Sequence, residues 1–270
     1  MPALPTVIKH GTPPYRIALL HGGPGAAGEM RPVAQRLSRH FGILECIQTQ
    51  NTITALIEEL HGQLAASTLL ATGGNAARPV TLVGFSWGAW LAFIFASRYP
   101  LLVGKLILIS AGSFVTQYNC DLMGTRLMRL SPQERAEAER LIVKLDTNAA
   151  DSGTLFRFGE LMTIADAYDY QPVPNKSVTL NAQQYQSIWP EAARMRDTGE
   201  LLRRARNIHC PVVAIHGTHD PHPLAGVKEP LSIELKDFRM HCLDKCGHTP
   251  WTEKHASNEF YKLLENEFME

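Results

Sequence analysis

The sequence lacks several features that would each indicate a particular class of protein. Its 26 basic and 26 acidic residues balance, and no basic run offers a surface for phosphate groups, which argues against nucleic acid as a partner. No apolar run approaches the ~20 residues of a membrane span, and residues 1–14 contain prolines instead of the apolar core of a signal peptide. The cysteines are few, scattered and odd in number, which favours a reducing compartment over a disulfide framework (Cys46, Cys120, Cys210, Cys242 and Cys246). We therefore expect a cytoplasmic protein with no membrane partner.

The chain is long enough to bury a large core, because 45% of its 270 residues are hydrophobic. In the first 110 residues, short apolar runs typical of buried strands alternate with apolar residues at helical spacing. The predicted strands are 15–20, 41–47, 80–83 and 105–110, with helices between them. This alternation predicts an α/β fold, with a mostly parallel, doubly wound sheet and helices on both faces.

The pattern changes after Ser110, because helical spacing then dominates until a strand is predicted at 211–216. Ser131 and Glu134 flank a proline at the start of one such helix and can complete a capping box. We therefore predict a helical cap inserted after the strand that ends near Ser110. The predicted division is a core domain made of residues 1–112 and 208–270, and a cap made of residues 113–207.

One short stretch carries the signature of a nucleophile. Gly84-Phe85-Ser86-Trp87-Gly88 lies between a predicted strand and a long apolar helical pattern, so the chain must turn sharply at Ser86. The two glycines allow strand and helix to cross closely, and the Ser86 hydroxyl then stands clear of both. The backbone N–H of Trp87 begins the helix, where unpaired donors favour a developing negative charge. The stretch therefore predicts a nucleophilic serine that needs a histidine and an acid as partners.

A second loop is rich in glycine. His21-Gly22-Gly23-Pro24-Gly25 directly follows the strand predicted at 15–20, and the carboxyl ends of parallel strands are where open α/β sheets bind ligands. Gly22 and Gly23 allow the backbone to approach a ligand and to present N–H groups to an oxyanion. A phosphate-binding loop is the competing interpretation, but no Lys-Ser/Thr follows and the spacing is not G-x-G-x-x-G.

The histidine and the acid that Ser86 requires are found on two later loops. Asp220 follows the strand at 211–216, and His248 follows a strand predicted near 238–243. A parallel sheet would bring all three side chains to one edge, although more than a hundred residues separate Ser86 from either partner. The chain order Ser, Asp, His is the one that accompanies a G-x-S-x-G turn.

Taken together, these motifs resemble the α/β-hydrolase superfamily with a helical cap. The resemblance rests on HGGPG at 21–25, GFSWG at 84–88, HGTHD at 216–220 and CGHTPW at 246–251, and spans nearly the whole chain. It implies that Ser86 is the nucleophile, His248 the general base and then acid, and Asp220 the group that orients the imidazole. It also implies an oxyanion hole made by the N–H groups of Gly23 and Trp87, and no cofactor.

Within the superfamily, HGGPG and the tryptophan after the serine resemble proline iminopeptidases and serine esterases. The resemblance implies a serine hydrolase that forms an acyl-enzyme on a small carboxylic ester or amide. The candidate substrate-binding residues are His21, Gly22, Trp251 and Glu160, with Asp166 and Asp169 as further cap acids that could recognise an amine. Three features depart from that branch: Gln48-Thr49-Gln50-Asn51 replaces its D-x-R-G-x-G-x-S loop, the turn at the serine begins Gly84-Phe85 and not Gly-Gly, and the strands before Tyr15 are shortened.

Other interpretations of the same residues stay open. An acyltransferase could use the same triad, and a non-catalytic receptor for a small ligand could share the fold. A metal site is conceivable at His216, His219, Asp220 and His222, but the triad already explains Asp220. Cys242, Cys246 and His248 lack the second cysteine pair of a zinc site, so buried thiols and no metal are expected. The sequence does not indicate an oligomeric state.

Overall fold

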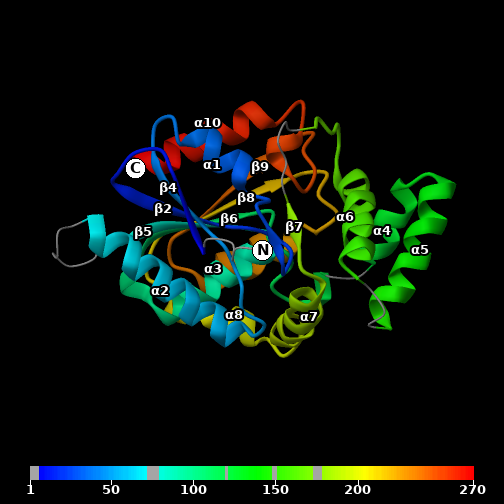
Figure 1. Ribbon diagram of the computed structural model, residues 1–270, viewed down its shortest axis with the longest axis horizontal. Helices are drawn as coiled ribbons and strands as arrows, with labels where there is room; N and C mark the ends of the chain where they lie inside the picture. The colour runs from blue at the N-terminus through cyan, green and yellow to red at the C-terminus, as the bar shows by residue number, and fades with distance from the viewer. Residues whose placement is uncertain (1–5, 72–78, 119–120, 148–150, 173–177) are drawn as a thin grey trace.

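In the computed structural model of the chain, a seven-stranded sheet forms the centre of the molecule (Figure 1). The structure describes residues 6–71, 79–118, 121–147, 151–172 and 178–270. The strands follow the order β1 (Val7–His10), β4 (Gly42–Cys46), β2 (Tyr15–Leu20), β5 (Val80–Phe85), β6 (Val103–Ile109), β8 (Val212–Gly217) and β9 (Phe238–Leu243). Every neighbouring pair is parallel except β1 and β4.

Helices cover both faces of this sheet, as the alternating sequence pattern predicted (Figure 1). One apolar cluster packs α2 (Ile53–Ala71), α3 (Trp87–Arg98) and α9 (Ala225–Glu234) against one face. The other cluster packs α1 (Arg31–Leu37) and α10 (Ser257–Met269) against the opposite face. All residues of β4 and β8 are buried, because a parallel sheet covered on both sides exposes neither face of its strands. The predicted fold class is confirmed.

Two elements differ from the sequence prediction. Strand β1 precedes Tyr15, outside the predicted strands, and it pairs with β4 alone at the edge of the sheet. Its residues are half-buried or exposed, so it lacks the apolar run of a central strand. Helix α9 contains Pro230 and Gly226, which weaken a helical pattern, but its buried Val227 and Leu231 hold it against the sheet.

The segment between β6 and β8 is mainly helical. It contains η2 (Thr116–Tyr118), α4 (Leu122–Arg129), α5 (Pro132–Asp146), α6 (Ser152–Asp166), β7 (Thr179–Leu180), α7 (Ala182–Asp197), α8 (Glu200–Arg203) and η3 (Arg204–Asn207). The predicted capping box starts α5: the Ser131 hydroxyl accepts from the N–H of Glu134, and the Glu134 carboxylate accepts from the N–H of Ser131.

These helices pack in two separate ways. Helices α4, α5 and α6 share a small apolar core of their own, which includes Leu130, Ala138 and Leu161, and they lie beyond the end of the sheet (Figure 1). The buried side chains of α7, Ile188, Ala192 and Met195, instead belong to the cluster beneath α2 and α3. Strand β7 also pairs with β3 (Ala26–Ala27), just after the glycine-rich loop. The α4–α6 group is therefore the part of the inserted segment that packs apart from the core.

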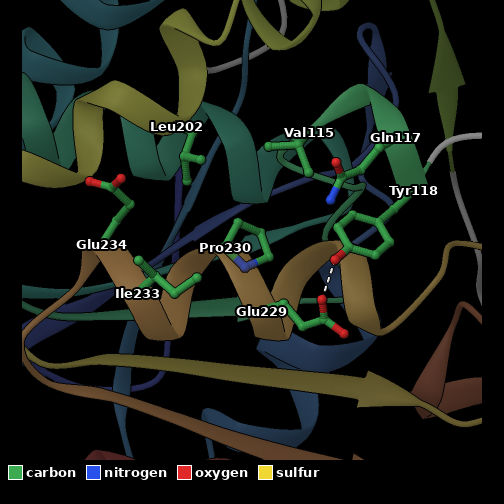
Figure 2. Close-up of a pocket in the computed structure, with 8 residues that line it drawn as sticks. All are labelled: Val115, Gln117, Tyr118, Leu202, Glu229, Pro230, Ile233 and Glu234. Atoms are coloured by element: carbon green, nitrogen blue, oxygen red, sulfur yellow. Dashed lines mark hydrogen bonds between the residues drawn. The ribbon is translucent and has the colours of Figure 1, made fainter.

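Two of the hollows on the surface of the described residues differ in character. The smaller one, of about 190 Å³, lies against α9, where the Tyr118 hydroxyl donates a hydrogen bond to Glu229 (Figure 2). The larger one, of about 610 Å³, lies between α6 and the β3–β7 ribbon. Among the described residues, no helix combines the length and the apolar character that a membrane span requires. Cys120 lies outside the described residues, and the other four cysteines are free thiols.

Candidate active site

The turn between β5 and α3 holds Ser86 in a strained conformation. Its φ of 53° and ψ of −117° lie outside the regions that residues other than glycine usually adopt, and such backbone strain concentrates at functional sites. The two glycines are required by close backbone approach. A Cβ atom on Gly84 would lie 2.1 Å from the carbonyl oxygen of Gly88, and one on Gly88 would lie 2.4 Å from that of His21. The Ser86 N–H donates to the carbonyl of Ile109 at 2.9 Å, which ties the turn to β6.

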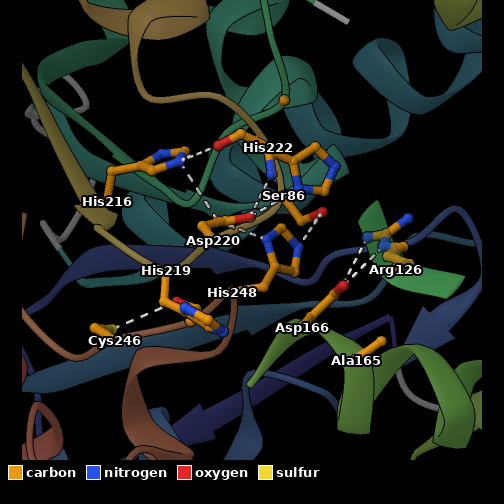
Figure 3. Close-up of polar contacts among 12 residues, drawn as sticks. Ser86, Arg126, Ala165, Asp166, His216, His219, Asp220, His222, Cys246 and His248 are labelled. Carbon is orange, nitrogen blue, oxygen red and sulfur yellow. Dashed lines mark hydrogen bonds and ion pairs between the residues drawn. The ribbon is translucent and has the colours of Figure 1, made fainter. Parts of the chain in front are cut away.

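The structure brings Ser86, His248 and Asp220 together at the carboxyl edge of the sheet (Figure 3). Nε2 of His248 lies 3.0 Å from the Ser86 hydroxyl oxygen, and Nδ1 of His248 lies 2.8 Å from Oδ2 of Asp220. Because a carboxylate only accepts hydrogen bonds, Nδ1 carries the proton and Nε2 is free to accept one from Ser86. This is the arrangement that activates a serine hydroxyl.

Burial and charge set the ionisation of this group. Burial acts to raise the pKa of Asp220, but His248, His216 and His222 lower that pKa well below its ordinary value. Burial acts to lower the pKa of His248, but the charge and hydrogen bond of Asp220 raise it above its ordinary value. The aspartate is therefore ionised at neutral pH and stabilises a proton on His248.

The glycine-rich loop follows β2 and lies beside the turn at Ser86. Gly23 has a φ of 36°, and its carbonyl accepts from the N–H of Ala26 at 3.1 Å to form a tight turn. A Cβ atom on Gly22 would lie 2.7 Å from the ring of Phe85, so this loop packs directly on the end of β5. Trp87 is the first residue of α3, where backbone N–H groups lack partners within the helix. The oxyanion hole made by Gly23 and Trp87 stays a prediction.

A residue that the sequence analysis did not select connects the two loops. Gln48 is buried directly after the carboxyl end of β4, and its side-chain amide donates to the carbonyl of His21 at 3.0 Å. Its side-chain oxygen accepts from the indole N–H of Trp87 at 2.8 Å. A polar residue directly after a buried strand is the signal that could have identified Gln48. Gln48 therefore fixes the distance between the glycine-rich loop and the start of α3.

Direct substrate contact by the four predicted residues stays a prediction, and their positions differ. The ring of His21 is 1% exposed; its Nδ1 donates to the carbonyl of Gly22 and its Nε2 accepts from the N–H of Gln48. Trp251 is also buried, and its ring packs edge-on against Phe85. Glu160 lines the larger hollow beside α6, where its carboxylate pairs with Arg157 at 3.2 Å.

Helices α4 and α6 are connected to the loops that carry His248 and Asp220, and Figure 3 shows the pair of Arg126 and Asp166 that takes part. Arg126 forms a bidentate ion pair with Asp166, with N–O distances of 2.7 and 2.6 Å, and the backbone carbonyl of Asp166 accepts from the N–H of His248 at 2.9 Å. Arg129 donates to the carbonyl of His219, next to Asp220, at 3.0 Å. Such bidentate, largely buried pairs hold geometry strongly. The position of α4 and the alignment of the three residues are therefore linked.

A buried carboxylate joins the same segments from the other side. Glu253 is 1% exposed and accepts three backbone hydrogen bonds, from Gly247 at 2.8 Å, Tyr168 at 2.9 Å and Asp169 at 2.8 Å. Gly247 precedes His248, whereas Tyr168 and Asp169 follow α6. Because a buried carboxyl group requires hydrogen-bond partners in place of water, Glu253 keeps the end of α6 attached to the His248 loop.

The residues that the sequence suggested as metal ligands are grouped differently in the structure. Within the described chain, the metal-binding atoms that gather within 4.8 Å of one another belong to Asp220, His222 and His248. In that group the Nδ1 atoms of both histidines lie 2.8 and 3.0 Å from the carboxylate oxygens, which are hydrogen-bond distances. A metal bound between them would have to displace both of those protons. The residues present therefore fit a hydrogen-bonded group better than a metal centre.

Comparison with known proteins gives one family. The model of the alpha/beta hydrolase family matches residues 17–261. The biotin biosynthesis bifunctional protein BioHC of Teredinibacter turnerae is 24% identical over 181 residues, which are 66% of this chain and 30% of that protein. The chain thus spans less than a third of the length of the curated relative it matches.

Solved structures of low sequence identity share the fold. The crystal structure of VinJ has a TM-score of 0.68 at 18% identity, with 97% of this chain and 94% of that chain covered. A thermophilic esterase from Thermogutta terrifontis has a TM-score of 0.62 at 17% identity, with 97% and 92% covered. A proline iminopeptidase of Mycobacterium smegmatis has a TM-score of 0.60 at 17% identity, with 97% and 93% covered.

The close approach at Gly84 predicts a large effect of a single methyl group. Gly84→Ala should lower the free energy of unfolding by about 3 kcal/mol or more, because a Cβ atom 2.1 Å from a backbone oxygen forces the turn apart. Gly62→Ala is the matched control: Gly62 lies in α2 with no atom within 4 Å of an added Cβ, so alanine should raise stability by up to about 1 kcal/mol. Urea denaturation of both variants measures this, and equal stability of the two would contradict the explanation.

The buried ring of His21 predicts a loss of stability in acid. Burial lowers the pKa of His21 from 6.5 to about 4, so between these values the unfolded chain takes up a proton that the folded chain refuses. The free energy of unfolding should therefore fall as pH decreases from 6.5 to about 4, with His21 contributing about 3 kcal/mol. His21→Gln should show a shallower decrease in denaturation measured across this range. Parallel curves for the two proteins would show that His21 does not contribute.

Proposed function

The chain belongs to the alpha/beta hydrolase family, and from that premise we propose that it is a serine hydrolase in which Ser86, His248 and Asp220 form a catalytic triad. One observation carries the proposal. The imidazole of His248 lies within hydrogen-bond distance of both partners, at 3.0 Å from the serine oxygen and 2.8 Å from the carboxylate. A serine hydroxyl needs such a base, and the base needs an orienting acid, before it can attack a carbonyl.

The proposed reaction proceeds through an acyl-enzyme. His248 Nε2 takes the proton from Ser86 as the serine oxygen attacks the substrate carbonyl, and Asp220 stabilises the imidazolium. The N–H groups of Gly23 and Trp87 donate to the oxyanion that forms. His248 then gives its proton to the leaving group. In the second half of the reaction His248 takes a proton from water as the water oxygen attacks the acyl-enzyme, and returns that proton to the Ser86 oxygen as the bond between Ser86 and the acyl group breaks. The Ser86 turn, already strained before substrate binds, keeps the oxygen directed at the carbonyl.

The substrate that we propose is a carboxylic ester with an apolar portion. The hollow beside α6 offers about 610 Å³, the size of a small-molecule site, and its lining combines the apolar Ala26, Phe156, Ile164, Val178 and Leu180 with the charged Glu29, Arg157 and Glu160. Ser86, His248 and Asp220 are not among the residues that line it. One structural neighbour is an esterase and another a proline iminopeptidase, which supports an ester or amide bond as the target.

The charges of the cap favour the ester over an amino-terminal amide. An enzyme that binds a free amine needs an unpaired carboxylate, but each of the three acids considered for that role already faces a cation. Glu160 pairs with Arg157, Asp166 with Arg126, and Asp169 with His255 and Lys254. The Asp166 pair is largely buried, so it is the one least available to a substrate.

Replacement of the proposed nucleophile tests the assignment. Ser86→Ala should abolish labelling by a fluorophosphonate and lower ester hydrolysis by roughly 10³- to 10⁶-fold, as loss of a triad serine does. Ser110→Ala is a matched control, because Ser110 also has a left-handed backbone, with a φ of 46°, and follows the neighbouring strand β6. The Ser110→Ala variant should be labelled by the fluorophosphonate as the wild-type protein is. Peptide mapping that finds the probe on another residue would disprove the role of Ser86. A panel of p-nitrophenyl esters and aminoacyl p-nitroanilides then separates ester from amide preference.

The raised pKa of His248 predicts the pH dependence of the reaction. Only neutral His248 can accept the serine proton, so kcat/KM should rise with pH and reach half of its maximum above pH 6.5. Asp220→Asn removes the charge that raises the pKa of His248, and it should shift this half-maximum to lower pH while reducing kcat/KM by roughly 10³- to 10⁴-fold. Initial rates across pH 5–9 measure both effects, and a pH profile unchanged by Asp220→Asn would contradict the role of the aspartate.

A further inference from the structure

The carboxylate of Asp220 accepts hydrogen bonds from two imidazole rings, one at each oxygen, and Nε2 of a third ring, that of His216, lies 3.5 Å from Oδ2 (Figure 3). Oδ2 accepts from Nδ1 of His248 at 2.8 Å, whereas Oδ1 accepts from Nδ1 of His222 at 3.0 Å and from the backbone N–H of His222 at 2.9 Å. The side chain of Asp220 is fully buried, so these donors replace water around its charge. His222 therefore makes a contact that a triad of three residues does not include.

The contact defines the protonation of His222. Because a carboxylate oxygen only accepts, Nδ1 of His222 carries the proton and its Nε2 carries a lone pair. Burial lowers the pKa of His222 to about 4, and the charges that act on it are those of Asp220, His248 and Arg126. The ring is therefore neutral at neutral pH. A neutral donor holds the carboxylate in place without cancelling the negative charge that His248 needs when it becomes protonated.

The ring of His222 also packs on the proposed base. Its centroid lies 4.6 Å from that of His248, with the ring planes 29° apart, and Phe85 contacts the His248 ring at 5.1 Å. The turn that carries His222 is itself fixed, because Nε2 of His216 donates to the carbonyl of His222 at 2.9 Å. The ring of His222 therefore holds both the carboxylate and the face of the His248 imidazole.

We propose that His222 is a positioning residue for the reaction, which acts through Asp220 by holding its second oxygen. This inference rests on the proposed function, since it assigns His248 as the base. The part of the ring that performs this role is Nδ1. In Figure 3 the other ring nitrogen, Nε2, lies on the side away from Asp220. A substitution can therefore remove Nε2 and still keep a hydrogen-bond donor in the place of Nδ1.

Two amide substitutions separate the two ring nitrogens. The side-chain amide of His222→Asn can donate from the place of Nδ1, whereas that of His222→Gln extends to the place of Nε2, and His222→Ala removes both. His209→Asn is the control, because His209 is exposed and precedes the opposite, amino end of β8. Two quantities are measured for each protein: the rate constant for labelling of Ser86 by a fluorophosphonate, and the downfield proton signal of the hydrogen bond between His248 Nδ1 and Asp220.

The expected result is a split between the two amides. His222→Asn should label within ~3-fold of the wild-type rate and keep the downfield signal, whereas His222→Gln and His222→Ala should label roughly 10- to 100-fold more slowly, as expected for loss of a hydrogen bond to a charged group. In the glutamine and alanine variants, the downfield proton signal should shift or disappear. If the alanine variant does not fold, the asparagine and glutamine pair decides the question alone.

Two results would overturn the proposal. Glutamine and alanine variants that label at the wild-type rate would show that Asp220 is held without His222. An asparagine variant as slow as the glutamine variant would show that Nδ1 is not the part of the ring that matters. Failure of the proposed function gives a different result, because the wild-type protein would then not be labelled at Ser86, and the proton signal alone would still report whether His222 holds Asp220.

Discussion

The desolvated charge of Asp220 is the constraint on which the rest of the site depends. A carboxylate with a fully buried side chain requires hydrogen-bond donors in place of water, and the chain supplies imidazoles of His248 and His222 for this purpose. The same charge raises the pKa of His248 against the opposing effect of burial. An acid that was better solvated would hold the imidazole less firmly, and the serine would have a weaker base.

The α4–α6 group contributes to this geometry from beyond the end of the sheet. Arg126 and Arg129, one turn apart on α4, reach the end of α6 and the loop of Asp220, and the carbonyl of Asp166 at the end of α6 accepts from the N–H of His248. The buried Glu253 binds the same segments through backbone N–H groups. The α4–α6 group has a separate apolar core, and these polar contacts connect it to the carboxyl edge of the sheet. Hydrogen bonds and bidentate ion pairs depend on direction, so they fix the relative position of the segments they join more strictly than apolar packing does.

Several features around the site lower the free energy of unfolding. Ser86 and Ser110 have left-handed backbones, His21 and His222 are buried without charge, and Arg126 is largely removed from water. Each of these features is unfavourable by itself, and the large apolar clusters on both faces of the sheet offset them. The structural neighbours share this fold at 17–18% identity.

Local patterns in the sequence were sufficient for the fold class, because apolar strands, helical spacing, the Ser131 capping box and the glycines beside Ser86 each act over a few residues. Because Ser86, Asp220 and His248 each follow a predicted strand, the sequence also predicted that the three would share one edge, since a parallel sheet places all its carboxyl ends together. Only the tertiary structure decided which distant residues contact one another. Gln48 accepts a hydrogen bond from Trp87 across 39 residues, Arg129 donates to the carbonyl of His219 across 90 residues, and edge strand β1 pairs with β4. His222 shows the difference most clearly, because the sequence placed it near a possible metal, whereas the direction of its ring, which packing alone sets, places Nδ1 on the carboxylate of Asp220.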